Sequence, residues 1–255
     1  MNHAYNSDAA SRAYQDFLAS EDGKLFRQIL GREFTRALLA NQSTHTDSTS
    51  TILDAGCGDG WLAGLLSEQF PSATIHACDA GEPLITTAKG AYPQVQFSVC
   101  DLNQPLPYEN NMFDVACASM VLHDVSDEAA TLTNIAHTLK PNGTLYASIV
   151  NPYYGYPVGE WKRGIVGRLL GQKPKLRLAR AYNVLAREAR PNFEWREHLG
   201  SHFTPLAAHM AAARSAGLVV SNITDITSTA DSDTYNLTYQ LHRFPIILLL
   251  EFKKK

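Results

Sequence analysis

A glycine-rich segment near the start of the sequence has residue types that suit a nucleotide-like ligand. Residues 54–60 read Asp-Ala-Gly-Cys-Gly-Asp-Gly and follow a short apolar run. Glycines at alternate positions let a backbone pass close to a ligand. Two further acids, Asp79 and Asp101, each end a later strand-like run. The segment therefore predicts a ligand site, and the question is which nucleotide it binds.

Two classes of cofactor are compatible with the glycine spacing. Gly58, Gly60 and Ala63 fit the G-x-G-x-x-A pattern of dinucleotide-binding proteins. A pyrophosphate, however, needs a helix N-terminus with backbone N–H groups aimed at it. Asp54 and Asp59 would repel phosphates and would suit a cation. S-adenosylmethionine has no phosphate and carries a sulfonium and an ammonium, so the acids favour this cofactor.

The later acids have separate expected roles in that site. Asp79 can accept hydrogen bonds from both ribose hydroxyls, and Asp101 is placed to receive the adenine amino group. The residues that we expect to contact the cofactor are Asp54, Gly56, Cys57, Gly58, Gly60, Asp79, Ala80, Leu84, Cys100, Asp101, Leu102, Ser119, Met120 and Tyr14.

The elements that must position these residues alternate along the chain. Strand-like segments cover 51–55, 74–80, 95–101, 113–120 and 144–150, and helix-like segments lie between them. Ser126 is the expected N-cap of the helix at 126–140, and residues 141–143 are an expected turn. This alternation predicts a parallel sheet with helices on both faces.

The flanking regions complete the expected fold. Residues 7–40 have helical apolar spacing, and 41–50 form a polar loop. A helix at 203–217, a strand at 218–226 and a last strand after Pro245 follow. No helix-length segment separates the last two strands, so they should pair antiparallel.

With these motifs the sequence resembles the class I S-adenosylmethionine-dependent methyltransferases, in particular the small-molecule branch. The resemblance rests on the loop at 54–60, the acids Asp79 and Asp101, and the segments 113–125 and 139–150. It implies an α/β, Rossmann-like fold with a seven-stranded sheet of order 3-2-1-4-5-7-6, in which strand 7 is antiparallel. Ligands should gather at the carboxyl ends of strands 1, 2 and 4.

The candidate catalytic residues are His123 and Asp124, just after the fourth strand. A histidine can act as a general base towards the acceptor or can position the loop and the cofactor. Ser119 and Met120 lie on the same edge and should contact the cofactor. Tyr14 either shields the methionine end of the cofactor, lines the pocket, or is a plain core residue.

Residues 152–202 interrupt the alternation and are expected to form a helical lid over the substrate. The organisation is then an N-terminal helical cap and linker (1–50), a cofactor-binding core (51–151), the lid, and the C-terminal part of the core (203–255). Ten Lys and Arg stand against four Asp and Glu between 151 and 200, which either attracts an acidic molecule or forms a solvated face. The residues expected to contact the substrate, unless they are ordinary packing, are Tyr153, Tyr154, Tyr156, Trp161, Trp195 and His198, with His202 as a further candidate base.

Composition and charge bear on the expected partners, metal content and location of the protein. The net charge of −3 gives no global attraction to nucleic acid or to an anionic membrane. No secretory signal or membrane-length apolar run is present, and the four cysteines form no C-x-x-C pair, so we expect no metal and a cytoplasmic location. The sequence says nothing of the oligomeric state.

The leading hypothesis is a cytoplasmic S-adenosylmethionine-dependent methyltransferase acting on an oxygen, nitrogen or carbon atom of a small metabolite. Three alternatives remain: an RNA or protein methyltransferase of the same fold, a scaffold that binds the cofactor without turnover, and a nicotinamide oxidoreductase. The acceptor itself is not predictable from the sequence.

Overall fold

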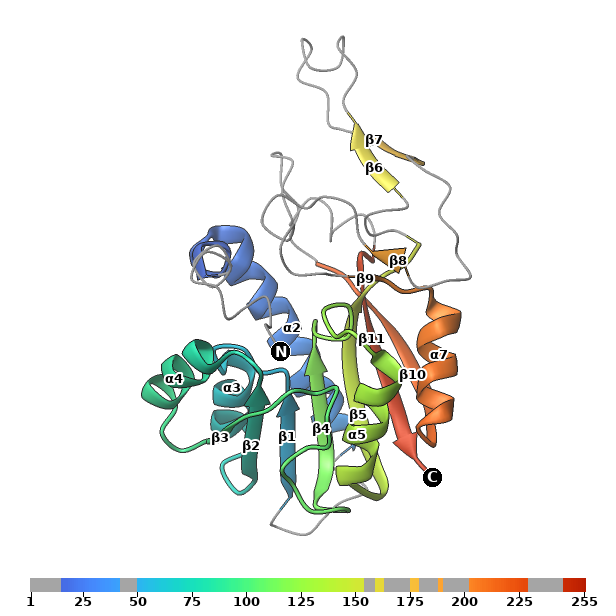
Figure 1. Ribbon diagram of the computed structural model, residues 1–255. Coiled ribbons are helices and arrows are strands. Elements are labelled where there is room, and N and C mark those ends of the chain that lie inside the picture. The colour runs from blue at the N-terminus through green and yellow to red at the C-terminus, as the bar shows by residue number, and fades with distance from the viewer. Residues whose placement is uncertain are drawn as a thin grey trace.

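The computed structural model describes residues 15–41, 50–153, 159–162, 175–178, 188–189, 202–228 and 245–255. Its core alternates strands and helices as expected (Figure 1). The helices are α2 (Glu21–Asn41), α3 (Trp61–Gln69), α4 (Glu82–Ala91), α5 (Glu128–Thr138) and α7 (Leu206–Ser215). The core strands are β1 (Thr51–Ala55), β2 (Thr74–Asp79), β3 (Gln96–Val99), β4 (Phe113–Ser119), β5 (Leu139–Val150), β10 (Leu218–Ile226) and β11 (Ile247–Lys254).

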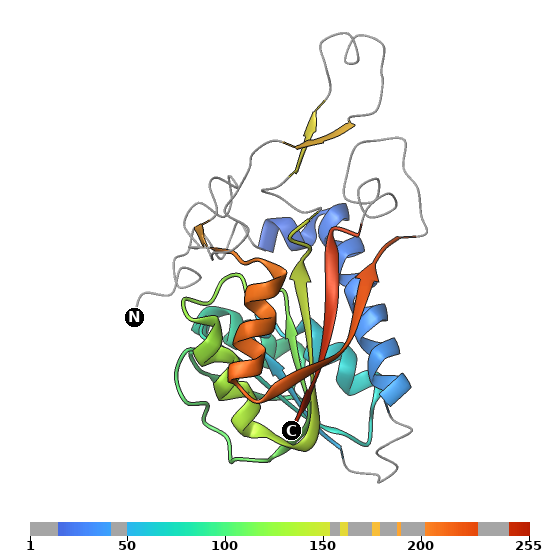
Figure 2. The ribbon, with the colours of Figure 1, turned by 90° about the vertical axis from the view of Figure 1, so that its right-hand side faces the viewer.

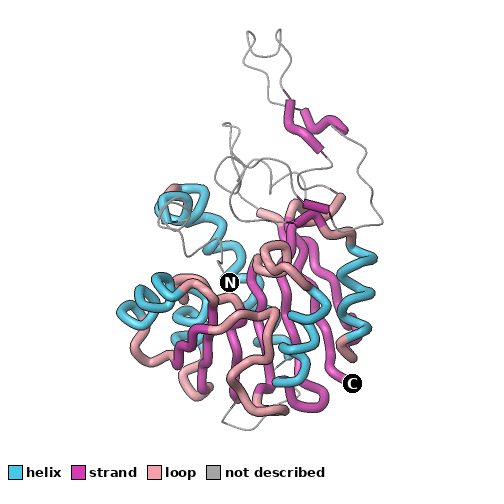
Figure 3. The backbone as a smooth tube through the Cα atoms, in the orientation of Figure 1, coloured by secondary structure: helices cyan, strands magenta, loops and turns pink. Residues whose placement is uncertain are grey.

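The seven core strands form one sheet in the order β10-β11-β5-β4-β1-β2-β3. Numbered along the core, this is the expected order 3-2-1-4-5-7-6. Strand β11 pairs antiparallel with both β5 and β10, while the pairs among β1 to β5 are parallel. From β1 the strand order runs to β2 and β3 on one side and to β4 and β5 on the other, so the order reverses between β1 and β4. The carboxyl ends of these parallel strands are therefore the expected ligand side. The loops that leave them lie at one end of the sheet (pink in Figure 3).

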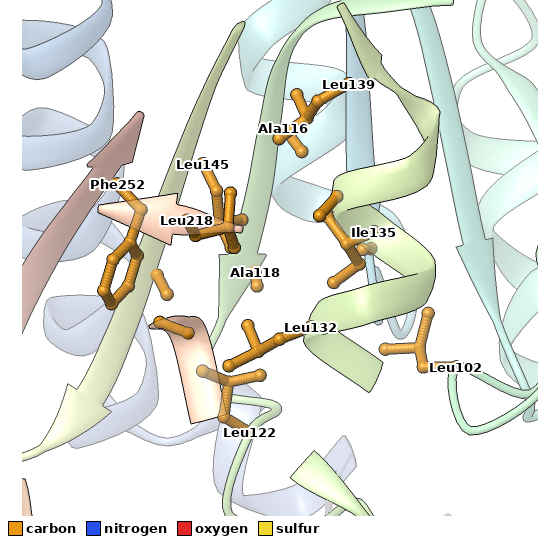
Figure 4. Packing of buried hydrophobic residues seen from close by; sticks show 14 of the residues in the cluster. Leu102, Ala116, Ala118, Leu122, Leu132, Ile135, Leu139, Leu145, Leu218 and Phe252 are labelled. Atoms are coloured by element: carbon orange, nitrogen blue, oxygen red, sulfur yellow. The ribbon is translucent and has the colours of Figure 1, made fainter. Parts of the chain in front are cut away.

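Helices cover both faces of the sheet and bury two apolar clusters (Figure 2). Leu132 and Ile135 of α5 and Ala213 of α7 pack on one face, as the close view in Figure 4 shows for α5. Helices α2, α3 and α4 cover the other face. On β11, Leu248 and Leu250 face the α5 side, while Ile247 and Leu249 face the α2 side. Because β11 is buried on both faces, its sequence is a continuous apolar run at 247–250.

Helix α5 begins one residue later than the sequence suggested. Asp127 is the N-cap, and its side chain accepts a hydrogen bond of 3.0 Å from the Ala130 backbone N–H. The prediction of Ser126 as the cap was therefore wrong. Both residue types cap helices well, and the choice follows from Asp127 having the extended backbone (φ −131°, ψ 100°) that a cap needs.

The fifth strand also begins earlier than predicted, at Leu139 rather than at Thr144. The expected turn at 141–143 is present inside the strand as an irregularity: Phe113 pairs with Leu139, and Val115 pairs with Thr144. Asn142 has a positive φ of 65° there. Asparagine tolerates this region better than most residues, so the chain bulges without leaving the sheet.

The N-terminal helical segment is interrupted. Residues 15–19 are helical and α2 starts at Glu21, with Ser20 between them donating its hydroxyl to the Phe17 carbonyl at 2.5 Å. The start of the expected helix, with Tyr14, and most of the loop at 41–50 lie outside the described residues.

Where the insert at 152–202 is described, it is extended rather than helical. Strand β6 (Gly159–Lys162) pairs antiparallel with β7 (Lys175–Leu178), and β8 (Glu188–Ala189) pairs with β9 (His202–Phe203). Lys-Leu-Arg-Leu at 175–178 alternates polar and apolar residues, which is the period of a strand. The prediction of a helical lid is therefore wrong for these short segments. None of the helices within the described ranges is long and apolar enough to cross a membrane.

We expect Asp127→Ala to lower the free energy of unfolding by about 1 kcal/mol, because the first turn of α5 loses its side-chain cap. Ser126→Ala, the matched control one residue away, should change it by less than about 0.5 kcal/mol. Urea unfolding followed by circular dichroism measures both. Equal losses in the two variants would contradict the assignment of the cap.

Candidate functional site

The glycine loop after β1 has a backbone that other residues cannot easily adopt. Gly56 and Gly60 have positive φ values of 78° and 80°. A Cβ at Gly56 would lie 2.4 Å from a methyl of Val121, and one at Gly60 would lie 2.8 Å from the ring of Phe97. The loop is therefore pressed between the segment after β4 and strand β3, which explains why glycine stands at these positions.

Four backbone N–H groups of this loop, those of Gly56, Cys57, Gly58 and Gly60, are already used within the protein. Gly56 and Cys57 donate to the Cys78 carbonyl at 2.8 and 3.0 Å, and Gly60 donates to the Cys57 carbonyl at 3.0 Å. Gly58 donates to the Asp79 carboxylate at 2.9 Å. A pyrophosphate needs such groups as donors, so this loop is poorly suited to a dinucleotide.

Asp79 joins the glycine loop to the start of α4. Its Oδ2 accepts the Gly58 N–H, and its Oδ1 accepts the Gly81 N–H at 2.8 Å. Each carboxylate oxygen has two acceptor sites. The side chain is thus held in a fixed orientation at the end of β2 and has acceptor capacity for hydroxyl groups of a ligand.

Asp54 is a carboxylate buried at the glycine loop, only 1% exposed. Neither of its oxygens has a hydrogen-bond partner among the described residues. Burial is the main cause that raises the pKa of Asp54 to about 7, and the charges of Asp79 and Asp59 raise it further, against the field of the Ala63 backbone N–H. A buried polar group without a partner costs free energy. A cationic group of a ligand would remove that cost.

Asp59 does not contribute the free charge that the sequence suggested. Its Oδ2 lies 2.6 Å from a terminal nitrogen of Arg27 on α2, and the guanidinium lies 5.5 Å from the centre of the Trp61 ring. The expectation that Asp59 repels phosphates and attracts a cation is therefore corrected, because Arg27 neutralises it. Arg27 was missed by the sequence analysis, and its distance of 32 residues from Asp59 leaves no local signal.

Asp101 follows β3 and is held by its neighbour Asn103. One oxygen of the Asp101 carboxylate accepts both the backbone N–H and the side-chain amide of Asn103, at 2.9 and 2.7 Å. Cys100, beside it, donates its N–H to the Asp79 carbonyl at 2.9 Å. The acid predicted for the adenine end is thus fixed to the acid predicted for the ribose. Asn103 is a second residue that the sequence analysis missed.

The end of β4 has a strained backbone beside the glycine loop. Met120 has a positive φ of 55°, and its N–H donates to the hydroxyl and the carbonyl of Ser148 on β5 at 3.0 and 3.1 Å. The Ser119 and Ser148 hydroxyl oxygens are 3.4 Å apart. Strain of this kind persists where the surroundings fix it and is common at functional sites.

His123 and Asp124 follow in the next turn. His123 is 3% exposed, and its Nε2 lies 3.6 Å from Oδ2 of Asp124. The Asp124 carboxylate therefore lies beside the imidazole and can help to orient it. The pair lies in the same loop as Val121, which covers Gly56.

The four cysteines are free thiols. Burial is the largest cause that raises the pKa of Cys57 and of Cys117 well above the ordinary range, and the Asp54 charge raises both further. These thiols stay protonated at neutral pH. In the part of the chain that the structure describes, no group of three His, Cys, Asp or Glu side chains is placed to hold a metal ion.

The remaining predicted residues fall into two groups. Ala80 is half-buried next to Asp79, while Leu84 and Leu102 are buried, Leu102 in the α5-side cluster. Tyr153 is 60% exposed at the start of the insert. Only the backbone of Trp161 and His202 is described. Tyr14, Tyr154, Tyr156, Trp195 and His198 lie outside the described residues.

We expect Asp54→Asn to change how stability depends on pH. A carboxyl whose pKa rises from 3.8 to about 7 on folding stabilises the protein at low pH, and that contribution is lost as the pH rises through about 7. The free energy of unfolding of the wild type should therefore fall between about pH 4 and 7, by up to about 1.4 kcal/mol per pH unit from this group. Asp54→Asn should remove this decline in urea unfolding measured across that range.

Asp114 provides a control of opposite sign. Burial alone would raise the pKa of Asp114, but hydrogen bonds from Lys140 and Thr51 outweigh it and lower the pKa. Its stabilising contribution is present at neutral pH and is lost only at acid pH. Asp114→Asn should lower stability at pH 7 and leave the decline between pH 4 and 7 in place. A decline that persists in Asp54→Asn would contradict the assignment to Asp54.

Comparison with known proteins agrees with this geometry. Residues 53–147 match a family model described as a methyltransferase domain. The malonyl-[acyl-carrier protein] O-methyltransferase of Halalkalibacterium halodurans is 32% identical over 111 residues, which are 42% of this chain and 41% of that protein. The trans-aconitate 2-methyltransferase of an Azoarcus species is 30% identical over 107 residues, 42% of each chain. The chain thus spans about two fifths of the length of these curated relatives.

A solved structure extends the similarity to most of the chain. The S-adenosylmethionine-dependent methyltransferase of Mesorhizobium loti superposes with a TM-score of 0.66 at 21% identity, covering 87% of this chain and 96% of that one. At this identity the similarity concerns the fold. Residues 53–147 therefore match the methyltransferase-domain family model, and the chain as a whole has the fold of the Mesorhizobium loti structure.

Proposed function

We propose that the protein is an enzyme that transfers a methyl group from S-adenosylmethionine to an oxygen, nitrogen or carbon atom of a small molecule. The observation that carries the proposal is Asp54, a carboxylate 1% exposed at the glycine loop whose oxygens have no hydrogen-bond partner among the described residues. A buried carboxylate of this kind is suited to the ammonium of a ligand and unsuited to a phosphate.

The other residues at the strand ends fit the rest of the same ligand. Asp79 is oriented by Gly58 and Gly81 and would accept the ribose hydroxyls. Asp101, held by Asn103, would accept the adenine amino group. The glycine loop, whose N–H groups are used internally, brings its backbone close to the ligand without offering a phosphate site.

Bound at this site, S-adenosylmethionine would supply an electrophilic methyl group on a sulfonium. In such a transfer the acceptor would supply the electron pair of the new bond to carbon, and the sulfur would keep the electrons of the bond that breaks. The protein's main contribution is then to align the acceptor behind the methyl and to exclude water. A proton on the acceptor leaves to a base or to solvent.

We propose that His123 positions the loop after β4, with Asp124 holding its ring. The burial of His123 and the 3.6 Å separation from Asp124 support this role. Loop strain at Met120 and the contact of Val121 with Gly56 connect this loop to the cofactor site. A role as general base is the alternative that the pH dependence of transfer distinguishes.

The acceptor is proposed to be a small molecule, enclosed by the N-terminal helical region and the insert at 152–202. The aromatic residues predicted there, Tyr14, Tyr153, Tyr154, Tyr156, Trp161, Trp195 and His198, would form its pocket. The ten basic residues between 151 and 200 favour an acceptor with acidic groups. Free thiols at Cys57, Cys78, Cys100 and Cys117 support a reducing compartment, the cytoplasm.

Titration with S-adenosylhomocysteine, the product of the transfer, tests the proposal. Binding should weaken as the pH falls from 8 to 6, by up to about tenfold per pH unit, because Asp54 must lose its proton to hold the ammonium. Asp54→Asn should bind more weakly at pH 8 and show a flatter pH dependence. Calorimetry in buffers of different ionisation enthalpy would detect the released proton.

Two controls separate Asp54 from the rest of the site. Asp79→Asn should weaken binding by about 1–3 kcal/mol at pH 8, because it removes charged acceptors for the ribose. It should also move the pH dependence to lower pH without removing it, because the Asp79 charge helps to raise the pKa of Asp54. NADH should not bind, because the N–H groups of Gly56, Cys57, Gly58 and Gly60 are already used within the protein. Binding of NADH without binding of S-adenosylhomocysteine would overturn the proposed function.

We expect His123→Gln to lower methyl transfer at all pH values alike, as a positioning role requires. The measurement is the transfer of a labelled methyl group from S-adenosylmethionine to a metabolite extract, followed from pH 6 to 9. Asp124→Asn should have a smaller effect in the same direction. A loss of more than about 100-fold with disappearance of the acid limb would instead assign His123 as the general base. No transfer by the wild type under broad conditions would favour a non-catalytic scaffold.

A further inference from the structure

Asn103 occupies a position between the proposed adenine site and helix α5 that the methyl-transfer chemistry does not itself require. Three of its polar groups have a partner among the described residues. The backbone N–H and the side-chain amide both donate to Oδ1 of Asp101, at 2.9 and 2.7 Å, and the side-chain carbonyl accepts the Asp127 backbone N–H at 2.8 Å.

This arrangement fixes the orientation of the Asn103 amide. Its oxygen must face the Asp127 N–H, which is a donor, and its nitrogen must face the Asp101 carboxylate, which accepts. Rotating the amide by half a turn would place two acceptors together at Asp101 and two donors together at Asp127. The side chain therefore has one favourable orientation.

Helix α5 supplies the rigid support for this contact. Asp127 is its N-cap, and Leu132 and Ile135 are buried in the apolar cluster against the sheet. Further along the helix, Asn134 donates its side-chain amide to the Leu102 carbonyl at 3.0 Å. The turn at 101–103 is thus attached to α5 through two asparagines: Asn103 donates to the Asp101 carboxylate, and Asn134 donates to the Leu102 carbonyl.

Two donors on one oxygen hold the plane of the Asp101 carboxylate. A carboxylate held in one orientation binds an amino group that points at it. It binds a carbonyl at the same place less well, because two hydrogen-bond acceptors then face each other. A carboxylate that turns freely rotates away from the carbonyl and discriminates less. The orientation therefore controls selectivity as well as affinity.

We propose that Asn103 is a positioning residue that determines selectivity for an adenine base, by holding Asp101 towards the exocyclic amino group. The inference rests on the proposed function, since it takes the adenosyl group as the ligand. The selectivity for the base is thus assigned to a contact with α5, and it does not depend on which methyl acceptor the protein uses.

The experiment compares the affinities of S-adenosylhomocysteine and S-inosylhomocysteine, in which a carbonyl replaces the amino group of the base. The wild type should bind the adenine ligand at least tenfold more tightly. Asn103→Ala should reduce this ratio at least fivefold. Asn103→Asp keeps an oxygen for the Asp127 N–H but places a carboxylate against Asp101, so it should reduce the ratio as well.

Asn134→Ala is the matched control, because it detaches the same turn from α5 without touching the Asp101 carboxylate. It should leave the ratio unchanged while lowering both affinities alike. The thermal midpoint of each variant shows whether it is folded. If Asn103→Ala does not fold, Asn103→Asp takes its place in the comparison of the two ligands.

The outcomes separate the inference from the proposed function. An unchanged ratio in both Asn103 variants, or an equal fall of the ratio in Asn134→Ala, overturns the role of Asn103. A wild type that binds both ligands equally overturns it too and leaves the proposed function intact. A wild type that binds neither ligand defeats the proposed function and, with it, this inference.

Discussion

The carboxylate of Asp79 holds together the two loops from which the site is built. It accepts the Gly58 N–H of the glycine loop through one oxygen and the Gly81 N–H before α4 through the other. The carbonyl of the preceding residue, Cys78, accepts two more N–H groups of the same loop. The glycine loop is therefore shaped on the end of β2, and the ligand-facing groups of β1 and β2 are fixed relative to each other. Without this contact the positive φ angles of the loop would have little to maintain them.

Charge at the site is set by burial and pairing rather than by the number of acids in the motif. Asp54 and Asp59 stand five residues apart in the glycine segment, yet their surroundings differ completely. Asp59 is matched by Arg27, whose guanidinium also lies over Trp61. Asp54 lies on β1 between β2 and β4, and burial is the main cause that raises the pKa of its carboxyl to about 7. Helix α2 thus supplies the cation that neutralises Asp59, whereas burial sets the pKa of Asp54.

The fold was predictable because its signals are local. Strand β1 reads as an apolar run that ends in Asp54 and glycines, and the alternation with helices persists as far as β5. The choice between Ser126 and Asp127 as cap was not predictable, because adjacent residues of similar type differ only in backbone angles. The residues that bind Asp59 and Asp101 were even harder to predict from the sequence. Arg27 lies 32 residues from Asp59 and Asp127 lies 24 residues from Asn103, so the contacts exist only once the helices pack.

The position of β11 has a consequence for how the chain is completed during synthesis. Strand β11 lies between β5 and β10 and is the neighbour of both, although β10 precedes it in the sequence. While a ribosome is still making residues 227–246, β10 has no strand beside it, and the outer side of β5 is exposed. The cofactor half of the sheet, β1 to β5, has all its own pairs by then. The seven-stranded sheet can therefore be completed only when residues 247–254 have emerged and pair with both β5 and β10.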